Sequence, residues 1–138
     1  MIILVINCGS SSIKYQLLDM KNDDVYELLA KGIVEKIGLE CGRLQHTPVG
    51  KQKVVKDLPV PDHTVGMQIV LDALIDKEYG VLKSFDDIEA VGHRIVQGAD
   101  FFSGSAIVDE DVISKIDFCC DFAPLHNPAH LLGIRACQ

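Results

Sequence analysis

The chain has 138 residues, of which 48% are hydrophobic, and 13 Lys and Arg stand against 20 Asp and Glu, so its formal net charge is −7. This length and apolar content suffice for one domain with its own core. The acidic balance disfavours a nucleic-acid or anionic membrane surface. No apolar run approaches a membrane-spanning length, and Met1 to Ile3 lacks the basic segment of a signal peptide.

The five cysteines are odd in number and follow no metal-binding spacing. Two of them are sequence neighbours, which suits neither a zinc pair nor an ordinary disulfide. We therefore expect reduced thiols and a cytoplasmic location, with no nucleic-acid or membrane partner. The cysteines are Cys8, Cys41, Cys119, Cys120 and Cys137.

The first nineteen residues predict a β-hairpin. An apolar run from Ile2 to Ile6 stops at Asn7, a Gly/Ser turn follows over residues 8–12, and the next residues alternate apolar and polar with period two. The turn gathers hydroxyls, exposed N–H groups, an amide and Lys14, all of which can face an anion. A phosphate-binding turn is one interpretation, and a plain polar turn is the other.

A P-loop is excluded at this turn. That motif needs G-x-x-x-x-G-K-[ST] followed by a helix. Here there is one glycine, Lys14 is followed by Tyr15, and the downstream pattern has the period of a strand.

Three further strands and a helix are predicted in the middle of the chain. The strands are Val25 to Val34, Arg43 to Thr47 and Lys53 to Leu58, the last two forming a hairpin. Apolar residues at helical spacing predict an amphipathic helix from Thr64 to Tyr79, ended by Gly80.

The last third predicts a strand and two helices. Ile88 to Val96 has the pattern of a buried strand, and Asp109 to Cys120 that of a helix capped by Asp109. A third helix starts at Asn127-Pro128, an N-cap followed by proline, and runs uncapped to Gln138. The order predicts a mixed α/β layer with early antiparallel strands, and the uncapped end leads us to expect a piece of a longer protein.

Two polar clusters follow the predicted late strand and precede the third helix. Arg94 lies in GHRIVQG at a strand end, where its guanidinium suits a carboxylate or phosphate; an ion pair with an acidic side chain is the alternative. His126 lies just before a helix N-terminus, a favourable place for an anion, unless it is a plain structural or loop residue.

The other histidines receive no role from the sequence. His130 is expected to face solvent or to pack one turn further along the helix. His46 and His63 are scattered, and we expect them to be structural or exposed.

Together the motifs INCGSSSIKY, GHRIVQG and APLHNPAHLLGI resemble the amino-terminal signatures of the acetate kinase family, in the acetate and propionate kinase group. The resemblance spans Ile3 to Ile134, with the motifs in the family's order. It implies a ribonuclease-H-like (actin-like ATPase) α/β domain of the actin, Hsp70 and sugar kinase superfamily, with a mixed sheet and flanking helices. Residues 1–138 would be the amino-terminal domain, with the second domain absent.

The resemblance also implies an activity. The family transfers the γ-phosphoryl group of ATP to acetate, reversibly, giving acetyl phosphate and ADP. ATP and Mg²⁺ are the implied cofactors, acetate or another short-chain carboxylate is the implied substrate, and the implied homodimer forms through the missing half. This half alone is expected to be inactive.

The first hairpin carries the implied nucleotide side of the site. Asn7 matches the family residue near the ATP phosphates and Mg²⁺. Ser10, Ser12 and Lys14 match the residues on the phosphate side of the hairpin.

The two later motifs carry the implied acyl side. Arg94 matches the arginine that holds the carboxylate and the transferring phosphoryl group, and His126 the histidine that stabilises that group. Val96 and Leu125 match residues of the apolar pocket for the acyl methyl. A valine at position 96 favours acetate over propionate.

Two positions depart from the family pattern. Gln97 replaces a histidine and cannot become cationic, and Ala99 replaces a glycine. Propionate kinase is the first alternative, and butyrate kinase, which usually has Thr in the first turn, is the next. From other classes, an inactive single-domain relative that binds phosphate or a partner remains open, whereas a chaperone-like or actin-like domain would lack the Arg94 and His126 clusters.

Overall fold

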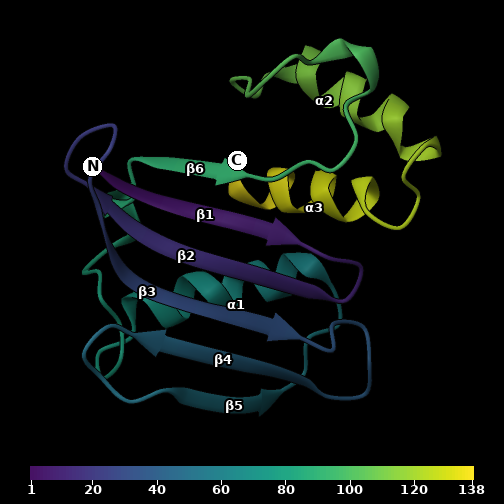
Figure 1. The fold of residues 1–138 in the computed structure, drawn as a ribbon. Coiled ribbons are helices and arrows are strands. Elements are labelled where there is room, and N and C mark those ends of the chain that lie inside the picture. Colours follow the sequence, from purple (N-terminus) through teal and green to yellow (C-terminus); the bar gives the residue numbers. More distant parts are fainter.

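The computed structural model describes all 138 residues, 1–138, as one mixed sheet with helices on one face and beyond one edge (Figure 1). The strands are β1 (Ile2–Cys8), β2 (Ser12–Met20), β3 (Tyr26–Glu35), β4 (Gly42–Pro48), β5 (Val54–Leu58) and β6 (Ala90–His93), and the helices are α1 (His63–Ile75), α2 (Glu110–Phe118) and α3 (Asn127–Cys137). Short 3₁₀ turns occupy Phe85–Asp87, Ala99–Phe101 and Cys119–Asp121. None of the helices is both long and apolar enough to cross a membrane.

The sheet has the strand order β5-β4-β3-β2-β1-β6. Strands β1 to β5 form an antiparallel meander, and β6 pairs with β1 in parallel, which confirms the predicted mixed sheet. Because Ile6 lies opposite His93 in that pairing, β6 ends at the same end of the sheet as β1. The β1–β2 turn lies at this end as well, since Cys8 pairs with Ile13.

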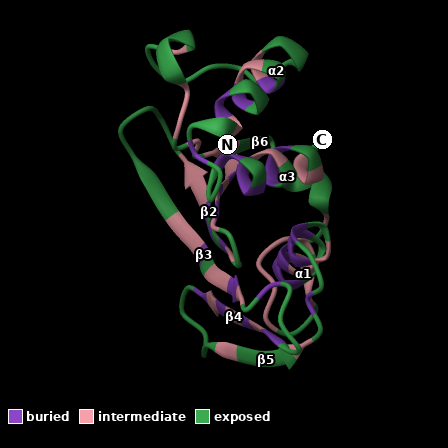
Figure 2. Cartoon of the chain, turned by 90° about the vertical axis from the view of Figure 1, so that its right-hand side faces the viewer, coloured by how far each residue is buried: buried purple, intermediate pink, exposed green.

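Alternation along the strands divides the sheet into a buried and an open face. The inward side chains of β1 and β2 pack against α1 and α3, which lie behind the sheet in Figure 1 and beside it in Figure 2. This cluster, called the sheet core here, has 16 buried residues: Leu4, Ile6, Cys8, Ile13, Tyr15, Leu17, Ala30, Val34, Ile37, Leu44, Val60, Met67, Val70, Ala73, Leu74 and Ala129.

A glycine makes room for a polar row inside the sheet core. Tyr15, Gly32 and His46 are neighbours on β2, β3 and β4, and a Cβ at Gly32 would lie 2.4 Å from the Tyr15 hydroxyl. The tyrosine therefore crosses over the glycine and donates its O–H to Nδ1 of His46 (2.6 Å). His46 Nε2 donates to the carbonyl of Tyr79 (3.3 Å), so the buried imidazole has both nitrogens bonded. The expectation that His46 is structural is confirmed.

Helix α1 is shorter than the sequence predicts. It begins after the N-cap Asp62, whose side chain accepts the N–H of Val65, and it ends at Ile75, not at Tyr79. The carboxylate of Asp76 accepts the N–H groups of Glu78 and Tyr79 and so provides a turn that competes with another helical turn. Apolar spacing alone does not reveal this competition.

The predicted buried strand from Ile88 to Val96 is wrong in length and in burial. Strand β6 has four residues and lies at the edge of the sheet, with Val91 exposed. A short edge strand has a neighbour on one side only, so an apolar sequence there does not require full burial.

Helix α2 confirms the predicted cap, because Asp109 accepts the N–H of Val112 (2.8 Å). It lies beyond β6, away from the sheet (Figure 1). Its buried residues Ile113 and Ile116 form only a three-residue cluster with Ile134 of α3, called the α2–α3 core here.

Candidate functional site

The β1–β2 turn is a tight turn held from outside by main-chain and histidine contacts. The N–H of Gly9 donates to the carbonyl of Ser12 (2.8 Å), and the N–H of Ile37 donates to that of Ser11 (3.0 Å). His63, at the start of α1, donates from Nε2 to the carbonyl of Gly9 (2.7 Å), which gives this histidine its structural role. The turn is thus fixed in place while the hydroxyl of the exposed Ser10 stays free for a ligand.

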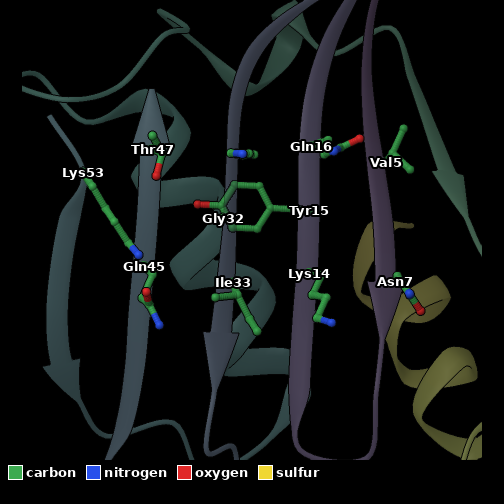
Figure 3. A pocket seen from close by; sticks show the side chains of 11 residues that line it. Val5, Asn7, Lys14, Tyr15, Gln16, Gly32, Ile33, Gln45, Thr47 and Lys53 are labelled. Carbon is green, nitrogen blue, oxygen red and sulfur yellow. The ribbon is translucent and has the colours of Figure 1, made fainter. Parts of the chain in front are cut away.

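Asn7 and Lys14 lie opposite each other across β1 and β2 and both line an open pocket on the helix-free face of the sheet (Figure 3). The pocket has a volume of about 430 Å³. No carboxylate lines it, and it contains three lysines, which form no ion pair in the structure. The lining residues are Val5, Asn7, Lys14, Tyr15, Gln16, Lys31, Gly32, Ile33, Gln45, Thr47 and Lys53.

Of the predicted site residues, only Asn7 and Lys14 line this pocket. The others lie on the β1–β2 turn and at the start of β2, after β6, and before α3. In a chain of net charge −7, a basic hollow without carboxylates is suited to an anion.

Arg94 follows β6 directly and is exposed. Its main-chain N–H donates to the carbonyl of Ile6 (3.1 Å). Arg94 therefore lies at the point where the parallel pairing of β6 with β1 ends. It makes no ion pair with a carboxylate of this chain, which removes the alternative that the sequence left open. The guanidinium is therefore available to a ligand at the end of the sheet that carries the β1–β2 turn.

The start of α3 differs from the sequence prediction. His126 is the N-cap residue and its side chain makes no capping bond, whereas Asn127, predicted to be the cap, is the first helical residue. The Asn127 side chain is fully buried and bonds the main chain of Gln97 instead: Oδ1 accepts from N–H (3.3 Å) and Nδ2 donates to the carbonyl (2.8 Å). His126 is exposed at the helix N-terminus, where a donor could reach an anion.

His130 is buried at 1% exposure, not solvent-facing. Its Nδ1 accepts the N–H of Val96 (3.4 Å), and its ring stacks on His126 (6.3 Å between centroids) and meets His93 edge-on (5.6 Å). Burial, followed by the neighbouring His93, lowers the pKa of His130 to about 4. The imidazole is consequently neutral near pH 7, as an acceptor at Nδ1 must be.

His93 completes this row of histidines and bonds the main chain of Arg94. Its Nδ1 donates to the carbonyl of Arg94 (2.8 Å), while its buried Nε2 has no hydrogen-bond partner. Burial lowers the pKa of His93, because a charge at this nitrogen would be poorly solvated. Gly133 permits the close approach, since a Cβ there would lie 2.3 Å from Nε2 and 2.6 Å from the Cys8 sulfur.

The two residues assigned to the acyl pocket are open to solvent. Val96 is 49% exposed and Leu125 is 71% exposed. Gln97 accepts the N–H of Ala99 through its side chain (2.8 Å). This bond fixes the loop after Arg94 locally, at a residue whose φ is +47°.

A metal ion would find few ligands in this chain. No group of three or more His, Cys, Asp or Glu side chains could hold one. Asn7 supplies a single amide oxygen, so these residues fit Mg²⁺ only if other oxygens, such as those of a nucleotide's phosphates, supply the remaining ligands.

The profile of the Acetokinase family matches residues 2–138. Acetate kinase from Caldanaerobacter subterraneus subsp. tengcongensis is 52% identical over 136 residues, which cover 99% of this chain and 33% of that protein. The chain thus spans about a third of the length of the curated relatives it matches.

Solved structures agree with this match. The crystal structure of Porphyromonas gingivalis acetate kinase has a TM-score of 0.92 and 45% identity, and covers 98% of this chain and 33% of that one. A propionate kinase from Francisella tularensis has a TM-score of 0.85 and 36% identity, covering 99% of this chain and 33% of that one. The expected actin-like ATPase fold is confirmed.

Proposed function

Since the chain belongs to the acetokinase family, we propose that it forms the amino-terminal domain of an acyl-phosphate-forming kinase that transfers the γ-phosphoryl group of ATP to acetate. One observation carries the proposal: the parallel pairing of β6 with β1 puts Arg94 at the end of the sheet where the β1–β2 turn lies. Motifs some 80 residues apart thereby meet at one edge. The C-terminal ends of parallel strands are a common place for ligands in α/β sheets.

The chemistry of the reaction suits these residue types. A carboxylate is ionised at pH 7 and needs no general base to act as a nucleophile. The difficulty is that an anion must approach a polyanion: two unit charges 4 Å apart repel by about 4 kcal/mol at an effective dielectric constant of about 20. Lys14 and Arg94 would offset that repulsion, and a donor at His126 would stabilise charge on the transferring phosphoryl group.

We assign the nucleotide phosphates to the β1–β2 hairpin, through Asn7, Ser10, Ser12 and Lys14. Mg²⁺ would arrive bound to the phosphates and stabilise their charge, with the Asn7 amide oxygen as a ligand from this chain. Val96 and Leu125 would enclose the acyl methyl group once the remainder of the enzyme closes over them. Homodimer formation remains a prediction from the resemblance, and a cytoplasmic location remains a prediction from the cysteines.

Propionate kinase is the second candidate, because the Francisella propionate kinase shares the fold at 36% identity. The two acids differ by one methylene, and a fitted apolar pocket separates such substrates by roughly 10–200-fold. Val96, larger than glycine or alanine, favours acetate.

Trapping of the acyl phosphate as its hydroxamate tests the proposal in the longest gene product that contains this chain. With ATP and Mg²⁺, acetate should turn over faster than propionate. Arg94→Ala should lower kcat by orders of magnitude, and Arg94→Lys should restore only part of it, because lysine lacks the bidentate fork. Arg43→Ala is the matched control, since Arg43 pairs with Asp57 at the far side of the sheet. A folded protein that is silent with both acids contradicts the proposed function.

A further inference from the structure

The first turn of α3 holds the main chain of residues 96 and 97 through two side chains. Asn127 bonds both the N–H and the carbonyl of Gln97, and His130 accepts the N–H of Val96. We propose that Asn127 and His130, called the α3 clamp here, are positioning residues that set the acyl-group selectivity of the site. This inference rests on the function proposed above.

The clamp is buried and its bonds cannot be exchanged cheaply for bonds to water. Asn127 is 0% exposed and His130 is 1% exposed. Nδ2 of Asn127 also donates to the carbonyl of Ile116 (3.3 Å), so one side chain connects α3, the end of α2 and the segment after Arg94. Leaving such buried groups unpaired is costly, and the bonds therefore restrict the main-chain position of the segment.

Side-chain packing fixes the two acyl-pocket residues only in part, because Val96 is about half exposed and Leu125 is mostly exposed. The position of Val96 is instead set by its main chain. His130 accepts the N–H of Val96, and Asn127 bonds the N–H and the carbonyl of the following residue, Gln97. Leu125 lies two residues before Asn127, in the turn that precedes α3. The clamp thus sets the separation of the two apolar side chains that would measure the length of the acyl group.

A pocket separates methyl from ethyl only if its walls stay in place. Discrimination of one methylene is worth roughly 10–200-fold in a fitted pocket, and it decreases when the walls can move apart. A loosened clamp should therefore lower the acetate-to-propionate ratio of kcat/KM. A purely structural role would lower the amount of folded enzyme, which changes both rates equally and leaves the ratio unchanged.

Matched substitutions separate the two roles. His130→Asn places an amide oxygen near the position of Nδ1 and keeps an acceptor for Val96, whereas His130→Gln places its amide near Nε2 and loses it. Asn127→Asp keeps the shape and the acceptor but turns a carboxylate oxygen toward two carbonyls. Arg135→Gln is the control on the same helix, since Arg135 makes an exposed ion pair with Glu110.

The experiment measures kcat/KM for acetate and propionate, with ATP and Mg²⁺, on one preparation of each variant of the longest gene product. We expect His130→Gln and Asn127→Asp to lower the ratio roughly tenfold. His130→Asn and Arg135→Gln should keep the wild-type ratio. An unchanged ratio in active His130→Gln and Asn127→Asp overturns the proposal.

Amide hydrogen exchange at Val96 and Gln97 provides a readout that needs no activity. Both amides should be protected in the wild type and in His130→Asn, and the Val96 amide should exchange faster in His130→Gln. Unprotected amides in the wild type overturn the clamp by themselves. Absence of wild-type turnover contradicts the proposed function instead, so the two failures are distinguishable.

Discussion

The two cores of this chain differ in size and in what depends on them. The sheet core joins β1 to β4 with α1 and one residue of α3 and contains 16 buried residues, whereas the α2–α3 core contains three. Figure 2 shows the same contrast, with much of α2 exposed. Arg94, Val96 and His126 all belong to the part of the chain beside the smaller core. The scaffold therefore depends on apolar burial, and the acyl side of the candidate site depends on polar bonds to α3.

The largest expected difference between the two cores is the loss of unfolding free energy when one isoleucine is truncated in each. Ile6 is 0% exposed and Ile116 is 2% exposed, so the deleted groups are matched. We expect Ile6→Ala to lower the free energy of unfolding by about 3–5 kcal/mol and Ile116→Ala by about 2–3 kcal/mol, because the smaller core can collapse around the cavity. Urea denaturation followed by circular dichroism measures both losses. Equal losses would contradict the expected difference in how the two cores respond to a cavity.

A fall in pH should lower the free energy of unfolding through His130, which lies beside the smaller core. The pKa of His130 is lowered to about 4 in the fold, below its ordinary value of 6.5, so the unfolded chain binds the proton more tightly. The neutral imidazole contributes its full share of the free energy of unfolding above pH 6.5, and this share, about 3 kcal/mol in total, is lost as the pH falls through 4. Burial lowers the pKa of His46 and His93 in the same direction.

The control for this prediction is His130→Asn, which keeps the acceptor for Val96 but cannot titrate. The difference in unfolding free energy between wild type and variant, measured from pH 7 to pH 4.5, isolates His130 from the carboxylates. A difference that does not change with pH would contradict the assignment of a buried neutral imidazole.

The smallest expected effect concerns the accessibility of the thiols in the native state. Cys8 and Cys119 are both buried, one in the sheet core and one at the end of α2, and Cys41 is exposed. Burial, followed by the nearby Cys137, raises the pKa of Cys8 to about 12. Of these three thiols, we expect an alkylating reagent to modify Cys41 first, Cys119 next through local opening, and Cys8 last. Mass spectrometry of timed samples gives the order, and modification of Cys8 before Cys119 would reverse the proposed ranking of the two cores.

The sequence predicts an element correctly where its residues follow the spacing of a strand or of a helix clearly. The alternation of Ile13, Tyr15 and Leu17 predicts β2, and Asp109 at the start of an amphipathic segment predicts α2. The predicted end of α1 is wrong because the Asp76 side chain competes for main-chain N–H groups. The predicted length of β6 is wrong because an apolar run does not reveal that its strand lies at the edge of the sheet.

The sequence by itself determined which residue types could handle an acyl phosphate and, through three motifs in order, the family to which the chain belongs. These inferences depend on local chemistry and spacing along the chain. Only the tertiary structure decided that Arg94 is free of ion pairs, that His130 is buried, and that Asn127 bonds Gln97 instead of capping α3. The reason is physical: the partners of Asn127 and His130 lie 30 or more residues away along the chain, and the packing of α3 against the segment after β6, not the local sequence, brings them together.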